Sequence, residues 1–247
     1  MKKALCFLTV RPSDDFFNLI DKSFSKKYDI FIIIDDNDYN VKEIFKKKFK
    51  IVQINNKEVE NKGYKNSVLW CKNRACSRDK ALYFLTYINN TYEYMWIIEE
   101  DVFIPNVKTL INIDKKYKKE DLLCEDLKIF NKEWNLWNDV IRITNGKLAT
   151  PYYKSMICGI RISRKILDVI QRFATKHNTL FLDEALFTTL GVKNNLNIKK
   201  IDELSTLIYR KNWIFREIKQ KNLYHPIKNH SIHHMFRNKL ITKNNKI

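Results

Sequence analysis

The stretch Tyr94-Met-Trp-Ile-Ile-Glu-Glu-Asp-Val-Phe-Ile-Pro105 is an apolar run that leads into three successive carboxylates, Glu99, Glu100 and Asp101. Such a run is typical of a buried strand, and open α/β sheets bind their ligands at the carboxyl ends of the strands. Three adjacent carboxylates repel one another near a low-dielectric core, so a divalent cation or basic groups are expected to offset the repulsion. The stretch therefore predicts an α/β fold with a metal that carries a nucleoside diphosphate.

The residues before this run alternate between strand-like and helix-like segments. Residues 4–10 and 29–35 are near-continuous apolar runs, the pattern of parallel strands covered on both faces. Ser13 or Asp14 is expected to cap a helix that runs to about Ser25. The next expected elements are a helix near 41–48, a short strand at 50–54 and a long amphipathic segment at 66–89. This order predicts a right-handed, doubly wound sheet with helices on both faces.

The pattern changes after Pro105. Residues 106–148 are expected to hold a helix and an irregular stretch that contains Trp134 and Trp137. A strand at 155–162, a helix capped by Ser163 and a helix at 180–190 ended by Gly191 are expected to follow. The sequence shows no internal repeat and no boundary that divides it, so one domain is expected over residues 1–247.

Composition limits the class of protein. With 247 residues, 45% of them hydrophobic, the chain is long enough for one sizeable core, and only four glycines and four prolines argue against disorder. The formal charge of +18 would suit a polyanionic partner, but much of the excess is scattered lysine. Runs such as 46–48, 115–119 and 237–246 are more typical of solvated faces than of binding sites. Specific nucleic-acid binding is therefore not expected as the main function.

The cysteines and the apolar segments indicate in which cellular compartment the protein is expected. The five cysteines show no CxxC spacing and are expected to be buried or partly buried free thiols in a reducing compartment. The apolar core of residues 4–10 is short and no small-residue cleavage site follows it, so it is expected to be the first strand rather than a signal peptide. No stretch approaches the roughly 20 apolar residues that a membrane span requires. The prediction is a cytoplasmic protein, in the host cytoplasm if the chain is viral.

These features together resemble glycosyltransferases of the GT-A fold. The resemblance rests on a nucleotide-binding N-terminal half, the triplet Glu99-Glu100-Asp101 at the end of a central strand, and the acidic pair Asp183-Glu184 in a later helix. It covers about residues 4–230, and small glycosyltransferases of large DNA viruses are the nearest members. The family uses nucleotide-sugar donors, usually with Mn²⁺ or Mg²⁺ at an Asp-x-Asp motif. The triplet departs from that motif but keeps carboxylates at all three positions, and oxygen ligands suit either ion.

The resemblance implies a GT-A-like (Rossmann-type) α/β fold with a mixed, mainly parallel central sheet. Residues 1–105 would be the nucleotide-sugar-binding half, 106–235 the acceptor-binding and catalytic half, and 236–247 a basic tail. UDP is favoured as the donor nucleotide because it is the commonest in the family. The other partner would be a glycan or another hydroxyl acceptor.

The resemblance also implies roles for single residues. Asp101, Glu99 and His225 would hold the metal, and Glu100 the ribose hydroxyls. The segment Arg78-Asp-Lys80-Ala-Leu resembles the family's Arg-Asn-x-Ala-Leu helix, in which the arginine meets the nucleotide. The remaining donor-binding residues would be Thr9, Arg11, Asp35, Lys80 and Lys228.

Transfer also requires a base for the acceptor hydroxyl. Asp183 and Glu184 lie among apolar residues, and desolvation makes a carboxylate more basic. In the GT-A pattern this acidic pair lies by the acceptor. Asp183 is the expected base, with Glu184 as its rival, and the expected outcome is inversion at the anomeric carbon.

Each signal has a second interpretation that the residues leave open. The triplet would also suit a solvated loop, and Asp183-Glu184 would also suit a helix start that meets the macrodipole. Arg78 and Lys80 would also suit a charged helix face, and Asp35-Asp36 a turn. The four histidines between 225 and 234 do not have zinc-site spacing, and Trp134 and Trp137 favour core packing over sugar stacking.

Three classes of function remain. A metal-assisted glycosyltransferase accounts for the carboxylates, the basic helix and the late histidine together. A nucleotidyltransferase shares the sheet layout, but Arg11-Pro-Ser-Asp14 stands where a Gly-rich phosphate loop would follow the first strand. A basic nucleic-acid-binding protein would account for the charge, but the sequence shows no helix-turn-helix, zinc-finger or aromatic RNA-binding signature.

Overall fold

A seven-stranded, mainly parallel sheet organises the protein. The computed structural model describes residues 3–20 and 22–244. The strands are, in spatial order, β3 (Lys50–Val52), β2 (Tyr28–Ile34), β1 (Lys3–Thr9), β4 (Tyr94–Glu99), β8 (Gly159–Ser163), β5 (Leu122–Cys124) and β9 (Ile198–Lys200). The pairs among β1 to β4 are parallel, whereas β8 is antiparallel to both neighbours. The predicted mixed, mainly parallel sheet and the parallel N-terminal strands are confirmed.

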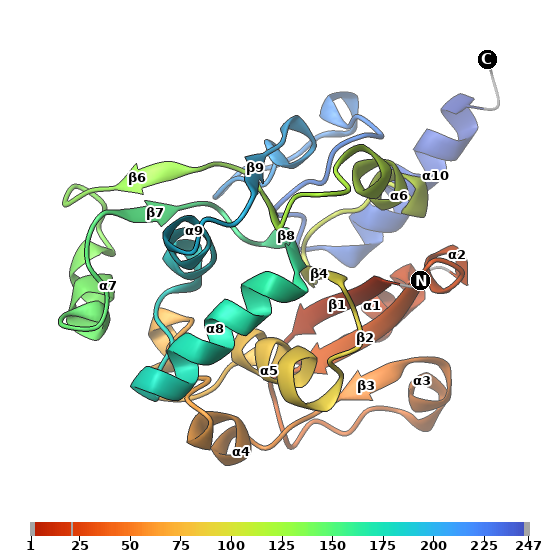
Figure 1. Cartoon of the computed structure of the whole chain (residues 1–247). Helices are drawn as coiled ribbons and strands as arrows, with labels where there is room; N and C mark the ends of the chain where they lie inside the picture. The colour runs from red at the N-terminus through yellow and green to blue at the C-terminus, as the bar shows by residue number, and fades with distance from the viewer. Residues whose placement is uncertain (1–2, 21, 245–247) are drawn as a thin grey trace.

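Helices cover both faces of the sheet (Figure 1). One face packs on α5 (Ser77–Tyr83), α8 (Arg164–His177) and α9 (Asp183–Lys193), and the other on α1 (Asp14–Leu19), α3 (Glu43–Lys48) and α6 (Val107–Lys116). Successive side chains of β1 pack on opposite faces of the sheet. The face covered by α5, α8 and α9 receives Ala4, Cys6 and Leu8, and the opposite face receives Leu5 and Phe7. A strand covered on both faces is apolar at every position, which accounts for the continuous runs in the sequence.

A smaller unit projects from the side of the sheet. The hairpin of β6 (Lys128–Phe130) and β7 (Tyr152–Lys154) and helix α7 (Trp137–Thr144) extend to the left in Figure 1. Trp134 and Trp137 pack against Phe130, with ring centroids 4.1 and 5.0 Å from it. The packing interpretation of these two tryptophans is therefore supported.

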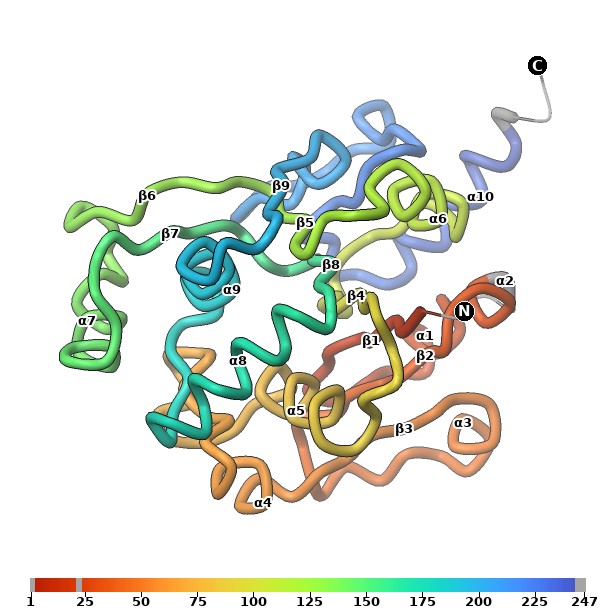
Figure 2. Tube along the Cα trace, in the orientation of Figure 1, coloured from red at the N-terminus to blue at the C-terminus, as the bar shows by residue number. Residues whose placement is uncertain are grey.

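The C-terminal segment returns to the N-terminal half. Residues 201–229 include the short 3₁₀ turns η3 (Asp202–Leu204) and η4 (Phe215–Glu217) and lead into α10 (His230–Asn244), which lies beside α1 (Figure 2). Phe236 and Leu240 are buried, and Arg237 donates to the carbonyl oxygen of Ile104 at 3.0 Å. The basic tail predicted from 236 thus begins inside a packed helix, and its last residues, 245–247, lie outside the described residues.

Several predicted element boundaries are wrong. The predicted helix up to Ser25 is divided into α1 and α2 (Lys22–Ser25), and the predicted strand at 155–162 begins only at Gly159. The short helix α4 (Asn56–Asn61) was not predicted. Gly191 does not end α9 but lies within it, where an added Cβ would come 2.7 Å from Ile198 Cδ1. The glycine therefore allows close packing of α9 on β9.

The long amphipathic segment predicted at 66–89 is α-helical only from Ser77. Helix α5 begins only at Ser77 and continues as a π-helical turn, η2 (Phe84–Ile88). Before it lies an irregular loop with one 3₁₀ turn, η1 (Leu69–Cys71). Asn66 and Asn73 have φ values of 71° and 57°, and the Asn73 backbone N–H donates to Asn66 Oδ1 at 2.8 Å. Left-handed asparagines close the loop and prevent a helix from passing through it.

Two further predictions concern cysteines and membrane spans. All five cysteines are free and buried, as predicted. Within the described residues, no helix has the length and apolar character needed to cross a membrane.

Candidate functional site

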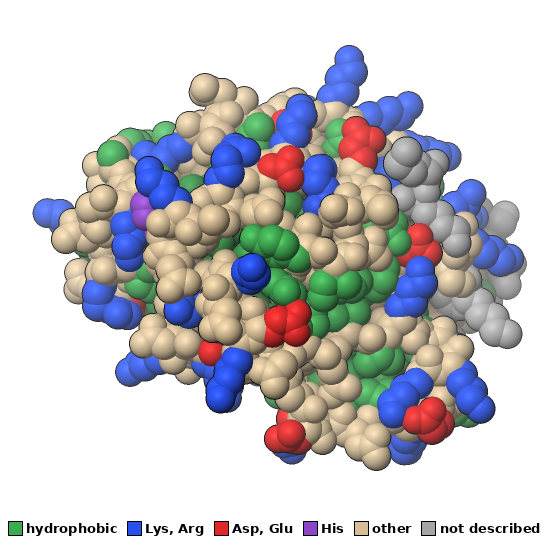
Figure 3. Space-filling model, turned by 60° about the horizontal axis from the view of Figure 1, so that its bottom comes forward, with side chains coloured by type: hydrophobic (Ala, Val, Ile, Leu, Met, Phe, Trp, Pro, Cys, Tyr) green, Lys and Arg blue, Asp and Glu red, His purple; other side chains and the backbone are tan. Residues whose placement is uncertain are grey.

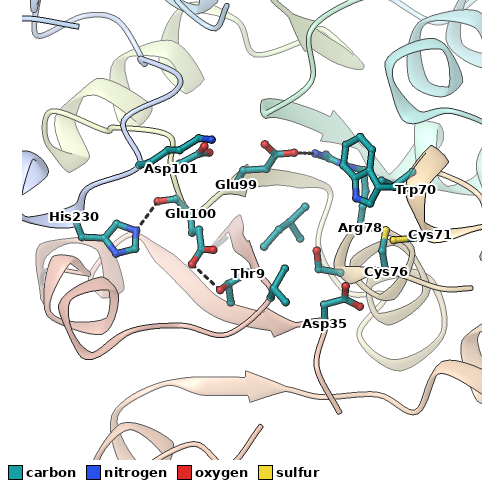
Figure 4. A pocket seen from close by; sticks show the side chains of 15 residues that line it. Thr9, Asp35, Trp70, Cys71, Cys76, Arg78, Glu99, Glu100, Asp101 and His230 are labelled. Atoms are coloured by element: carbon teal, nitrogen blue, oxygen red, sulfur yellow. Dashed lines mark hydrogen bonds and ion pairs between the residues drawn. The ribbon is translucent and has the colours of Figure 1, made fainter. Parts of the chain in front are cut away.

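A cavity of about 420 Å³ lies at the carboxyl ends of β1 and β4. Figure 4 shows Trp70 on one side of it and His230 on the other, with Glu99, Glu100 and Asp101 between them. Of the predicted site residues, those that line the cavity are Thr9, Asp35, Arg78, Glu99, Glu100, Asp101 and Lys228. The parallel register places Leu8 opposite Glu99, which brings the ends of β1 and β4 together.

Glu100 is held by the first strand. Thr9 Oγ1 donates to Glu100 Oε2 at 2.6 Å, and the Glu100 backbone N–H donates to the carbonyl oxygen of Leu8 at 3.0 Å. Burial raises the pKa of Glu100, and the hydrogen bond from Thr9 opposes this. The triplet is therefore part of a built site and does not form a freely solvated loop.

His225 approaches the other two carboxylates from a segment far away in the sequence. Its Nε2 lies 3.5 Å from Asp101 Oδ2 and 3.9 Å from Glu99 Oε2. Its Nδ1 lies 3.0 Å from the carbonyl oxygen of Ile208, so Nδ1–H donates and Nε2 faces the carboxylates. Burial lowers the pKa of His225, but the hydrogen bond to Asp101 and the charges of Asp101 and Glu99 outweigh this and raise it.

These three side chains fit a divalent cation. Asp101 Oδ1 is buried and has no hydrogen-bond partner among the described residues. Donor atoms of Glu99, His225 and Cys158 all lie within 4.8 Å of one another. Burial raises the pKa of the Cys158 thiol well above its usual range, so the anionic donors are the carboxylates. Carboxylate oxygens with one imidazole suit Mn²⁺ and also allow Mg²⁺.

Arg78 joins the cavity to the acidic pair on α9. It is fully buried; its Nη2 donates to Glu99 Oε1 at 2.6 Å, and its Nε lies 2.7 Å from Asp183 Oδ2. Burial acts to lower the pKa of Arg78, but Asp183 and Glu99 outweigh it and raise the pKa. The interpretation of Arg78 as part of a charged helix face is therefore wrong.

Asp183 and Glu184 begin α9. Burial raises the pKa of Asp183 to about 7, although Arg78 opposes this shift. Burial also raises the pKa of Glu184. The Asp183 backbone N–H donates to the carbonyl oxygen of Ser67 at 2.8 Å, which attaches the start of α9 to the loop before α5. Both residues remain candidates for a base; neither lines the cavity among the described residues.

Lys80 supports the end of β2. It is fully buried, and its Nζ donates to Asn37 Oδ1 at 2.7 Å and to the carbonyl oxygen of Asp35. A charged helix face is therefore excluded for Lys80 also. Asp35 lines both the first cavity and a second one, of about 510 Å³, together with Arg11. Arg11 is exposed and pairs with Asp36, whose Oδ1 accepts from the Asp38 backbone as in a turn.

Sequence reasoning missed several residues of the cavity. His230 lies with Nε2 3.3 Å from the carbonyl oxygen of Glu100, and Trp70 lines the wall although 85% of its surface is exposed. Cys71 and Cys76 lie beside Trp70 in the same wall (Figure 4). Trp70, Cys71 and Cys76 lie in the segment 66–89, whose amphipathic spacing did not single them out. Asn66 and Asn73 were the available signal, because asparagine tolerates the left-handed region.

Comparisons with known proteins show the fold. No protein-family model matches the chain, and no curated protein matches it. The solved structures that it resembles include the galactosyltransferase LgtC in complex with donor and acceptor sugar analogues, at 8% identity, with 96% of this chain and 95% of that chain covered and a TM-score of 0.52. Another is apo mouse xyloside xylosyltransferase 1, at 8% identity, with 82% and 86% covered and a TM-score of 0.44. The likeness to LgtC shows that this chain has a GT-A-like fold.

Proposed function

We propose that the protein is a glycosyltransferase that moves a sugar from a nucleoside-diphosphate sugar to a hydroxyl acceptor with a divalent cation. The observation that carries the proposal is the convergence of Glu99, Asp101 and His225 beside a cavity that the two carboxylates line, on a GT-A-like fold. UDP is the favoured donor nucleotide, and Mn²⁺ or Mg²⁺ the favoured ion. Residues 1–105 form the donor half in this proposal, and residues 106–235 the acceptor half.

In the donor half, one group of residues would hold the cation and another would bind the nucleotide. Glu99, Asp101 and His225 would hold the cation, which supplies positive charge to offset the charge that develops on the leaving diphosphate. In this proposal Thr9, Arg11, Asp35 and Glu100, which line the two cavities, would bind the base and ribose. The exposed Lys228 would bind a phosphate. The buried cations Arg78 and Lys80 would contribute indirectly. Arg78 positions Glu99, and Lys80 positions Asp35.

The acceptor half would supply the base. Asp183 is the proposed base, because its pKa of about 7 lets it be deprotonated near neutral pH while remaining basic enough to take a hydroxyl proton. Glu184 remains the alternative, since it lies next in the same first turn and is only half-buried. With a separate base for the acceptor, transfer would proceed with inversion.

The charge of the surface does not favour a polynucleotide as the main partner. On the face seen in Figure 3, Lys and Arg side chains are scattered among neutral ones and do not gather into one continuous stripe. On this face the charge therefore favours a weak general attraction to polyanions over a defined groove.

A ligand titration tests the proposal. The thermal stability of the full chain would be measured with UDP, GDP, CDP, the triphosphates UTP, GTP and CTP, and a polynucleotide, each with and without Mn²⁺. A ligand that binds the native state raises its apparent stability. We expect one diphosphate, UDP, to stabilise the protein only when Mn²⁺ is present. Stabilisation by a nucleoside triphosphate but by no diphosphate would favour a nucleotidyltransferase, and tight, salt-sensitive polynucleotide binding alone would overturn the proposal.

A further inference from the structure

Two cysteines form a contact pair in the wall of the cavity. Cys71 ends η1 and Cys76 immediately precedes α5, so four residues separate them. Both line the cavity, and Figure 4 shows their side chains next to each other. The proposed transfer reaction uses neither thiol.

The surroundings of the two thiols differ. The hydrogen bond from Cys76 lowers the pKa of Cys71 to about 7, against burial and the charge of Asp35, and Arg74 assists. Contact with Cys71, burial and the charge of Asp79 all raise the pKa of Cys76. Cys76 Sγ lies 3.1 Å from Asp79 Oδ2, so the carboxylate competes with the Cys71 sulfur for the single S–H proton of Cys76. Cys71 is therefore the nucleophile of the pair, and Cys76 is a protonated partner beside a carboxylate.

We propose that Cys71 and Cys76 are a site of reversible oxidation, at which a hydroperoxide converts the contact pair into a disulfide in the cavity wall. Among the described residues, Cys6, Cys124 and Cys158 do not line this cavity, and burial raises the pKa of each of their thiols. The position of Cys71 and Cys76 next to each other in the cavity wall therefore selects this pair for oxidation.

The chemistry balances in two steps. The Cys71 thiolate attacks one oxygen of the hydroperoxide, the O–O bond breaks, and the other oxygen leaves with a proton as an alcohol or, from hydrogen peroxide, as water. The Cys76 sulfur then attacks the Cys71 sulfenic acid, the S–O bond breaks and the S–S bond forms. The Cys76 proton passes by way of Asp79 to the departing hydroxide, which leaves as water. The two thiols lose two electrons and the hydroperoxide gains them.

Peptide mapping tests the proposal on the unaltered full chain. The reduced protein would be treated with equimolar hydrogen peroxide at pH 7, its remaining thiols alkylated, and the chain cut with trypsin. Trypsin cleaves after Lys72 and Arg74, so the disulfide appears as peptide 66–72 joined to peptide 75–78, two hydrogen atoms lighter than the separate thiol peptides. We expect this joined peptide before any oxidation at Cys6, Cys124 or Cys158, and we expect dithiothreitol to separate it. Oxidation of Cys71 to the sulfinic acid without a link to Cys76, a link to Cys158, or earlier oxidation of the other three would overturn the proposal.

Two variants separate the roles of the pair. In Cys76→Ala, which removes both the second sulfur and the hydrogen bond to Cys71, peroxide should leave a Cys71 sulfenic acid that dimedone traps. The midpoint of the pH dependence of Cys71 alkylation should also move from about 7 toward the ordinary thiol value of about 8.5. Cys6→Ala, at a buried thiol on β1, is the matched control and should still give the joined peptide. An unchanged midpoint in Cys76→Ala would contradict the assignment of Cys71 as the activated thiol.

Discussion

Asp101 is the residue on which the proposed cation site depends most directly. Its Oδ2 faces His225, and its buried Oδ1 has no hydrogen-bond partner in the part of the chain that the structure describes, so an added cation would satisfy both atoms. We expect Asp101→Asn to weaken Mn²⁺-dependent UDP binding by more than about 100-fold, because a direct ligand should matter more than the 10- to 100-fold typical of outer-shell partners. Calorimetric titration with and without Mn²⁺ measures this. Glu43→Gln, an equal change of charge at an exposed position on α3, should bind as the wild type does.

Asp183 gives a prediction about pH. A base works only when deprotonated, so with a pKa of about 7 the value of kcat/KM should fall about tenfold per pH unit below pH 7 and level off above it. Asp183→Asn should lower transfer by about 10²- to 10⁴-fold, while UDP binding changes little. Transfer assays across pH with the wild type, Asp183→Asn and Glu184→Gln check this. Loss of transfer in Glu184→Gln alone would assign the base to Glu184.

Trp70 exposes its indole beside the cavity, where it can stack on a nucleotide base. We expect Trp70→Ala to weaken UDP binding by about 5- to 150-fold, which corresponds to the 1–3 kcal/mol typical of base–aromatic stacking. Trp70→Phe should retain most of the affinity. Because 85% of Trp70 is exposed, the melting temperature without ligand should stay unchanged. Equal affinity in Trp70→Ala and in Ile44→Ala, a distant exposed residue, would show that Trp70 does not touch the nucleotide.

The site residues that could be predicted are those that lie next to one another in the sequence. Glu99, Glu100 and Asp101 are consecutive, so one strand end delivers all three. The bridge from Glu99 through Arg78 to Asp183 joins three distant segments, and no local pattern shows which cation will lie between which carboxylates. The roles assigned to single residues remain predictions.

At the scale of elements, the end of α4 fixes the loop that leads to the cavity. Gly63 follows α4 with φ at +80°, and an added Cβ would lie 2.4 Å from the carbonyl oxygen of Ala174 on α8. Gly63→Ala should therefore cost the strain of a left-handed alanine, about 1–2 kcal/mol, and in addition the displacement of α8. Gly146→Ala is the matched control, since its φ is +69° but no atom lies within 4 Å of the added Cβ. Chemical denaturation should show Gly63→Ala to be at least about 1 kcal/mol less stable than Gly146→Ala. Equal decreases in the free energy of unfolding would mean that α8 can shift away from the added methyl group without cost.

Element prediction succeeded where burial fixes the pattern and failed where side chains redirect the backbone. β1, β2 and β4 are covered on both faces, so their apolar runs are unbroken. The segment 66–76 has amphipathic spacing, but Asn66 and Asn73 turn the chain, and Asp79 Oδ2 accepts from the Cys76 backbone N–H at 3.0 Å to start α5. Hydrogen bonds of this kind compete with helix formation and leave no trace in hydrophobic periodicity.

At the scale of the whole molecule, the charge balance makes the protein sensitive to acid. The chain carries +18 at pH 7 with neutral histidines, and each protonated histidine or carboxylate adds to the repulsion within the compact state. A buried histidine that must stay neutral adds a further cost, because the unfolded chain takes up its proton more readily than the folded one.

His233 is such a histidine, and it ties α10 to the segment before it. Its Nε2–H donates to the carbonyl oxygen of Ile227 at 2.7 Å, and burial, assisted by the charge of Arg237, lowers its pKa to about 3. The unfolded chain has the ordinary value of about 6.5, so the contribution to stability is complete above pH 6.5 and falls as the pH drops from there toward 3. Between pH 6 and 4 the free energy of unfolding should therefore fall by up to about 1.4 kcal/mol per pH unit because of this residue.

The variant His233→Gln isolates that contribution, because the glutamine amide can also donate to Ile227 but does not titrate. Denaturant unfolding of both proteins at pH 4, 5, 6 and 7 should give a steeper pH dependence for the wild type than for the variant below pH 6, with parallel curves above pH 7. The comparison cancels the effects of the other titrating groups, which are common to both proteins. Curves that stay parallel down to pH 4 would mean that His233 can be protonated without loosening α10 from residue 227.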